Sequence, residues 1–388
     1  MTFTPRKLAF AYLFSLFFLT AVGETLISTL FPLIRTDVDL AVADQAVVTA
    51  ALTLMIGVGN LVGGWIGLRH SDRLAVRLAA VLLAVGAFGS AASAGLIALA
   101  LAQMVMGAGI GLFFGPGLSS IGRLYAEMRG RAIASYGLAY SLGLATAAFA
   151  SNVGVSGWRI VFLVIGVLAV GMALITPDVA DATPEPPTSL LRSAADYTRR
   201  PLYRLALGTG VVAGTVHYVI VGLTPELFVG RGVRLALVTG VVGVGRLVSM
   251  ITKYFAGWAI DRWGGPRSAE LIMIAMVTFG AAELLLPGRW ALLPILPFVA
   301  FTSMLFPVSN VMVVSALPAR ASWGVGIYRA TLMLASAACA GLMSVALRWF
   351  DTRTVMLAGL AIPLLGIVSV VQMRVAPTLD AQPTAARG

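Results

Sequence analysis

The chain has 388 residues, of which 59% are hydrophobic and 11% are charged, and its mean hydropathy is +0.95. A soluble domain is about 45–50% apolar and about 25% charged, so this composition excludes an ordinary soluble enzyme. The net charge of +11 does not indicate nucleic-acid binding, because the basic residues are scattered between apolar stretches rather than gathered in a block. The single cysteine, Cys339, excludes an internal disulfide.

Long apolar stretches recur along the whole chain. A hydrocarbon core of ~30 Å requires about 20 apolar residues per helix. The first stretch follows Arg6 and Lys7 and continues past Glu24, which is too long for the apolar region of a cleaved signal peptide. The sequence therefore predicts twelve transmembrane helices, at residues 8–34, 44–68, 74–94, 96–122, 132–153, 158–176, 203–228, 234–260, 268–286, 290–316, 324–347 and 354–374.

A polar segment, residues 177–202, separates the sixth predicted helix from the seventh. Its proline, aspartate and arginine content is incompatible with lipid, so it is predicted to be a cytoplasmic linker. It divides an all-α integral membrane protein into an N-terminal six-helix bundle, residues 1–176, and a C-terminal six-helix bundle, residues 203–376, with a tail at 377–388. The basic residues concentrate on the side that holds the N-terminus, which predicts that both termini are cytoplasmic.

The two halves show traces of an internal repeat. At one constant offset Gly64-Trp65 matches Gly257-Trp258, each at the end of the second helix of its half. The same offset places Pro32 over Pro225, and Glu24 over His217. Three coincidences at one offset favour a duplicated six-helix unit, as in many transporters.

One loop carries a recognisable pattern. Residues 257–267, GWAIDRWGGPR, resemble the G-x-x-x-D-R/K-x-G-x-R loop of the major facilitator superfamily, which that family has between its second and third helices and, less strictly, between its eighth and ninth. Arg129-Gly-Arg131-Ala132 resembles the R-G-x-A that often follows the fourth helix there. Length, helix count and linker extend the resemblance to the whole chain. It implies a secondary transporter with two six-helix bundles that works by alternating access.

The same resemblance implies a cytoplasmic gate at these loops. Glycines let helix ends approach closely, and an aspartate at a helix end can face a neighbouring helix N-terminus and the arginines. The first-half copy has Leu68 where the second has Asp261, and its nearest acid is Asp72, so the gating role is better supported for Asp261. The candidate gate residues are Gly64, Asp72, Arg73, Gly257, Asp261, Arg262, Gly264 and Arg267.

Three ionisable residues fall at one depth in the predicted membrane. Glu24, His217 and Arg246 each lie about ten to twelve residues from the outer end of a helix, which is about 15–18 Å. Charged groups at this depth are costly and are functional candidates. We expect Glu24 to carry the proton and His217 to share it or to donate to substrate. Lys253 lies on the face of Arg246, two turns away, so the two can form a track for an anionic group.

A structural interpretation of these residues stays open. Glu24 and Arg246 can form a permanent ion pair, His217 can bond a backbone carbonyl, and Lys253 can extend to the membrane surface. Further candidates for the cavity wall are Gln103, Tyr140, Asn310 and Arg329, although Arg329 is also placed to anchor its helix at the cytoplasmic side. Gln103 replaces the arginine of the R-x-x-x-G-x-G pattern that drug antiporters of the superfamily often have, which weakens a multidrug assignment.

The sequence has no phosphate-binding loop and no metal-ligand or nucleophile–histidine–acid arrangement; its only histidines are His70 and His217. It predicts no enzyme, cofactor or metal. The leading hypothesis is proton-coupled efflux of a small organic molecule across the inner membrane, with efflux favoured only by the resemblance to compact bacterial members of the family. The alternative is proton-coupled uptake of an organic anion; a transport-dead sensor or scaffold is a third. The expected partners are a small-molecule substrate, protons and the lipid bilayer, without nucleic acid, and the chain is expected to act as a monomer.

Overall fold

The computed structural model describes residues 5–125, 129–154, 157–178, 195–316 and 321–375. Within these ranges the chain is built from helices without strands. Ten helices are long and apolar enough to cross a membrane, and two shorter apolar helices, Gly137–Phe149 and Trp158–Leu174, stand at the fifth and sixth predicted positions. The predicted all-α membrane fold is therefore confirmed.

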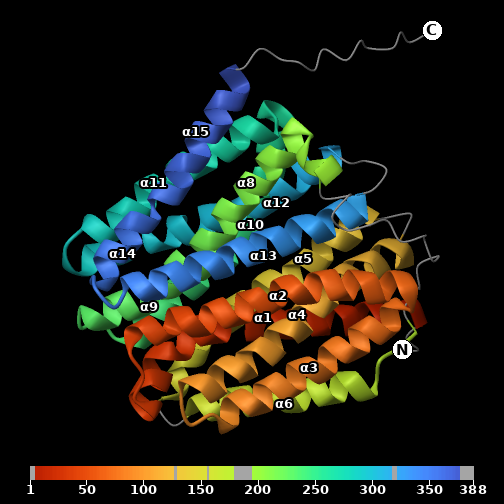
Figure 1. Cartoon of the computed structure of the whole chain (residues 1–388), viewed down its shortest axis with the longest axis horizontal. Coiled ribbons are helices and arrows are strands. Elements are labelled where there is room, and N and C mark those ends of the chain that lie inside the picture. The colour runs from red at the N-terminus through yellow and green to blue at the C-terminus, as the bar shows by residue number, and fades with distance from the viewer. Residues whose placement is uncertain (1–4, 126–128, 155–156, 179–194, 317–320, 376–388) are drawn as a thin grey trace.

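The first half consists of helices that pack along their lengths (Figure 1). They are α1 (Pro5–Val38), α2 (Val42–Arg69), α3 (Asp72–Ala92), α4 (Leu96–Leu124), α5 (Arg129–Phe149), the 3-10 turn η2 (Ala150–Val153) and α6 (Trp158–Leu174). Helix α4 packs on α2 and α3, α1 packs on α5, and α3 packs on α6. Small residues permit this closeness, because a Cβ atom on Gly59 of α2 would lie 2.6 Å from the carbonyl oxygen of Ala108 in α4.

The second half repeats this arrangement with more broken helices. It comprises α8 (Pro201–Thr215), a π-helical turn η4 (Val216–Ile220), α9 (Val221–Gly230), α10 (Leu235–Trp263), α11 (Gly265–Leu285), η5 (Gly288–Leu292), α12 (Ile295–Ala316), α13 (Ala321–Ala346), α14 (Thr352–Gly359) and α15 (Ala361–Val375). Helices α8, η4 and α9 form one continuous apolar span, Pro201–Gly230. Helices α14 and α15 together supply the last span, Thr352–Gln372.

The two halves lie side by side and meet mainly through three helix pairs. Helix α13 packs against α2, α10 against α5, and α9 against α1. The start of α1, the start of α8 and the end of α15 all lie on the side of the bundle away from α9 and α14; the start of α1 is at the right of Figure 1 and the end of α15 at its top. We call this the linker end and the opposite end the far end.

Candidate substrate and proton site

Glu24 lies in the middle of α1 and is only 4% exposed. The Tyr140 hydroxyl on α5 donates a hydrogen bond to its Oε2 atom at 2.8 Å, and the Tyr218 hydroxyl on η4 donates to its Oε1 atom. Each carboxylate oxygen therefore has a hydroxyl donor. One tyrosine belongs to the first half and the other to the second, so the carboxylate joins the two halves.

Local structure fixes both tyrosines. The Tyr140 ring stacks on the Phe17 ring, with centroids 5.1 Å apart. Tyr218 lies in the π-helical turn, where the Val221 N–H bonds to the Val216 carbonyl five residues back. Single π-helical turns within α-helices are frequent at functional sites.

Two arginines of the second half lie within electrostatic range of Glu24. Arg246 on α10 is 3% exposed and Arg329 on α13 is 7% exposed. Neither forms an ion pair with any residue that the structure describes. The Nε and Nη1 atoms of Arg246 and the Nε atom of Arg329 are buried without a hydrogen-bond partner in the described chain. The Arg329 guanidinium lies 3.6 Å from the centroid of the Phe114 ring, a cation–π contact.

His217 and Lys253 lie within electrostatic range of these arginines or of each other, and Asn310 is a further polar residue in the second half. The Nε2 atom of His217 and the Oδ1 atom of Asn310 are buried and have no partner among the described residues. The His217 ring makes an edge-to-face contact with Phe306, at 5.6 Å between centroids. Lys253 donates a hydrogen bond from Nζ to Ser141 Oγ on α5 at 2.8 Å, so it links the halves rather than extending to the membrane surface.

The structure thus brings Glu24, Tyr140, His217, Arg246 and Arg329 into one buried cluster. The direct ion pair between Glu24 and Arg246 that the sequence left open is not formed, because the two tyrosines hold the carboxylate. Gln103 lies elsewhere: its Nε2 atom donates to Ser90 Oγ at 2.9 Å, between α4 and α3.

The first-half gate residues form contacts within their own half and with the start of the linker. Asp72, in the first turn of α3, is 3% exposed and forms an ion pair with Arg123 of α4. Arg73 forms an ion pair with Asp178, and its Nη2 atom donates to the Thr176 carbonyl at 3.2 Å. These contacts tie the start of α3 to α4 and to the end of α6. Gly64 is half-buried in the last turns of α2.

The second-half gate residues lie where α10 turns into α11. Gly264 ends α10 with φ of 78°, a conformation that favours glycine. The Arg262 guanidinium lies 5.8 Å from the centroid of the Trp258 ring. Gly257 is half-buried and Arg267 is exposed. The side chain of Asp261 lies outside the described residues, as do those of Arg129 and Arg131, so the described chain contains an aspartate–arginine pair only for the first-half loop.

Sequence reasoning missed a polar contact between the halves at the far end. Arg35 of α1 forms an ion pair with Glu226 of α9, with 2.8 Å between Nη2 and Oε1. Gln45 of α2 donates from Nε2 to the Gly222 carbonyl at 2.7 Å. The repeat supplies a signal for the first pair, because Arg35 and Glu226 follow the matched prolines Pro32 and Pro225 and so share a depth.

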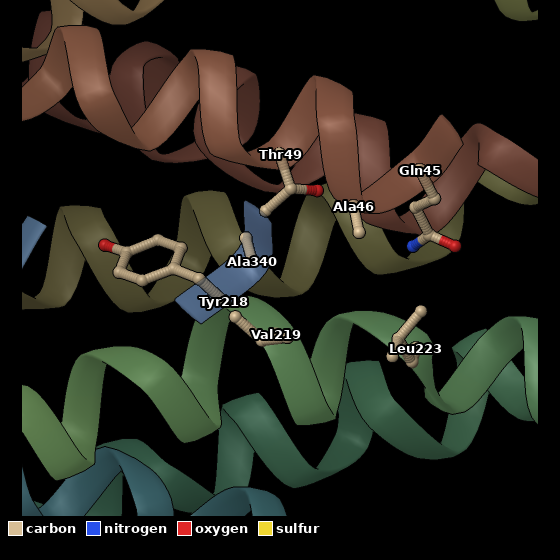
Figure 2. Close-up of a pocket in the computed structure, with 7 residues that line it drawn as sticks. All are labelled: Gln45, Ala46, Thr49, Tyr218, Val219, Leu223 and Ala340. Atoms are coloured by element: carbon tan, nitrogen blue, oxygen red, sulfur yellow. The ribbon is translucent and has the colours of Figure 1, made fainter. Parts of the chain in front are cut away.

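A small cavity marks how closely the halves pack here (Figure 2). Figure 2 shows Gln45, Ala46 and Thr49 of α2 opposite Val219 and Leu223, with Ala340 of α13 alongside. The volume that the centre of a water molecule can occupy is about 10 Å³, so the cavity has room for about one water molecule. The far end is therefore closed.

The comparisons with known proteins agree with this architecture. The family model described as Major Facilitator Superfamily matches residues 13–322. A search of the curated proteins finds no match. Among solved structures, the chain is similar to a D-xylose–proton symporter, with a TM-score of 0.70 and 19% identity over 94% of this chain and 96% of that one.

Two further structures show the same fold. One is a bacterial homologue of the human lysosomal transporter Spinster in an inward-facing conformation, with a TM-score of 0.73 and 16% identity over 96% of this chain and 97% of that one. The other is the nucleoside transporter NupG, with a TM-score of 0.76 and 12% identity over 94% of this chain and 99% of that one. The chain belongs to the major facilitator superfamily and is a multi-pass membrane transporter that works by alternating access, not an enzyme.

Proposed function

We propose that this transporter carries an organic anion together with a proton, as a symporter of the inner membrane. The observation that supports this is an excess of positive charge in the buried cluster. Arg246 and Arg329 have N–H groups without partners among the described residues, and Glu24 is a carboxylate within electrostatic range of both. A buried guanidinium without a partner is costly, and an anionic ligand group would satisfy it.

The charges also favour one sense of coupling. A bound anion and the Glu24 carboxylate compete for the same two guanidiniums. A proton on Glu24 removes its negative charge, so the arginines bind the anion more strongly, and by reciprocity the anion favours the protonated carboxyl. Symport requires such positive coupling. Efflux by proton exchange requires the proton to displace the substrate, so this site supports the uptake alternative better than the efflux that family resemblance favours.

Movement of the two halves relative to each other would change the surroundings of the Glu24 carboxylate. Tyr140 and Tyr218 donate to one carboxylate from opposite halves, so a rocking motion that separates the halves takes at least one donor away. Loss of a donor to the charged form favours protonation. With the linker end assigned to the cytoplasm from its arginines, the far end is the outer side, and its opening would expose Glu24 to the more acidic exterior.

The test is a flux measurement with purified protein in proteoliposomes that contain a pH-sensitive dye. Pools of carboxylates and phosphate esters are added outside, with pools of organic cations and neutral sugars as comparison. We expect internal acidification that depends on an anion pool and is absent with the other pools. Anion flux without proton movement would make the protein a uniporter, and proton movement opposite to substrate would make it an exchanger; either result contradicts the proposal.

The far-end contact makes a separate prediction. Glu226→Gln removes the charge opposite Arg35 and should raise the open-to-closed ratio of the far end about fivefold, because a partly exposed ion pair contributes about 1 kcal/mol. Spin labels at Ala41→Cys and Arg234→Cys, in a Cys339→Ser background, report the distance across the two halves. We expect a larger long-distance population in Glu226→Gln.

The matched control is Asp37→Asn. Asp37 pairs with Arg159 at 2.9 Å, also at the far end and with the same loss of charge, but both residues belong to the first half. Its distance distribution should equal that of the parent. Equal shifts in the two variants would show that the effect comes from surface charge and not from the contact between halves.

A further inference from the structure

We infer that a groove on the outer surface of the first half, between α3 and α6, binds an anionic phospholipid, with its phosphate on Arg77 and one acyl chain along the groove. The groove has a volume of about 260 Å³. Arg77 is the one charged residue in its lining, and the other lining residues are apolar. This combination of one cation and a long apolar trough matches a lipid and not a water-soluble ligand.

The dimensions of the groove suit an acyl chain. It runs along α3 from Arg77 to Phe88, which is about 16 Å at 1.5 Å per residue and about half of a ~30 Å hydrocarbon core. Its floor is made by small buried residues, Ala84 and Ala173. Phe88 closes the deep end, because its ring packs against Gly166 of α6, where a Cβ atom would lie 2.6 Å from Cε1. The groove therefore begins at the linker end and stops inside the bilayer.

The charges at the linker end leave Arg77 available. Arg73 lies one turn before it on the same face of α3 and already pairs with Asp178. Arg77 is exposed and forms no ion pair with the residues that the structure describes. Its guanidinium can bind a phosphate through two N–H groups, and its long stem can reach the headgroup level from within the apolar region.

The membrane itself supplies the occupant. The groove faces lipid on both sides, since Val85 of α3 is 54% exposed and Leu174 of α6 is 75% exposed. An acyl chain fills such a trough without loss of hydrogen bonds, whereas water does not. An anionic headgroup is favoured over a zwitterionic one because Arg73 pairs with Asp178 and Arg123 with Asp72, which leaves the charge of Arg77 in excess among the described residues here. The proposal does not depend on which solute is transported.

Native mass spectrometry of the full-length protein in detergent tests the proposal, with phosphatidylglycerol and phosphatidylcholine as probes. We expect preferential retention of phosphatidylglycerol and about tenfold weaker binding in Arg77→Ala, equivalent to about 1.4 kcal/mol. Val170→Trp, which fills the groove from α6, should weaken binding of both lipids. The matched controls are Arg204→Ala, an exposed arginine on α8, and Leu168→Trp, an exposed position on α6 turned away from the groove; both should bind like the parent.

Three results would overturn the proposal. Phosphatidylglycerol binding that is unchanged in both Arg77→Ala and Val170→Trp would remove the groove as the site. Competition by glycerol phosphate as strong as that by the intact lipid would show that the acyl chain makes no contribution. Lipid binding that appears only after deletion of residues 181–190 would show that the linker of this chain is the occupant.

Discussion

Glu24→Gln is expected to abolish uptake driven by a proton gradient while exchange of labelled for unlabelled substrate continues. Glutamine reproduces the neutral, protonated carboxyl, so the halves can still move with substrate bound, but no proton is carried. The variant should bind the anion about tenfold more tightly, about 1.4 kcal/mol, because the competing negative charge is gone. Apparent affinity in the parent should rise as pH falls, since proton and anion binding are positively linked, and this dependence should be lost in the variant.

The measurement pairs gradient-driven uptake with exchange in the same proteoliposomes at several pH values. Glu283→Gln is the matched control. Glu283 is a buried carboxyl of α11 that accepts a hydrogen bond from Thr224 Oγ1 at 2.8 Å, outside the Glu24 cluster. Its substitution should leave coupling intact. Gradient-driven uptake that persists in Glu24→Gln would remove Glu24 from the proton pathway and make it a structural residue.

Arg246→Ala is expected to weaken binding of the transported anion by about 1.5–3 kcal/mol, the contribution of hydrogen bonds to a charged group, which is about ten- to hundredfold in affinity. Arg246→Lys keeps the charge but not the planar pair of donors, so it should recover affinity only in part. In both variants, the binding affinity for a neutral analogue of the substrate should fall far less than the affinity for the anion. The comparison of anion with analogue separates recognition of charge from general damage to the site.

Equilibrium binding to purified protein measures these affinities. Arg234→Ala is the control, because Arg234 lies just before α10, is exposed at the far end, and is remote from the cluster. Equal losses for the anion and its neutral analogue in Arg246→Ala would contradict the assignment of an anionic substrate.

Most of the fold could be predicted from the sequence, because each crossing of the bilayer leaves a long apolar stretch. The predicted spans 74–94 and 158–176 agree within a few residues with α3 (Asp72–Ala92) and α6 (Trp158–Leu174). The depth of a residue in the membrane could be predicted too, since it follows from the number of residues between it and the end of its helix. Glu24, His217 and Arg246 were placed in one layer in this way, and the structure brings them together.

The direction in which a side chain points around its helix axis could not be predicted in the same way. Gln103 was a candidate for the cavity wall, but its side chain turns to Ser90 of α3. Arg329 was equally suited to anchoring a helix, yet its guanidinium lies over Phe114 of the other half. Such pairings join residues far apart in the sequence, across helices whose rotation is set by packing. The partners of Glu24 were missed for this reason, Tyr218 above all.

The π-helical turn at Val216–Ile220 divides the seventh span into two parts with different attachments. The linker-end part is held to α13, where the Tyr328 hydroxyl lies against Gly210, at 2.6 Å from a Cβ atom built there. The far-end part carries Glu226, which is held by Arg35 of the other half. A π-helical turn contains one residue more than an α-helical turn, so its conversion to an α-helical turn would rotate the helix on one side by about 100° relative to the other. The far-end part can therefore turn about its own axis, and with it the Tyr218 hydroxyl, while the linker-end part stays packed on α13.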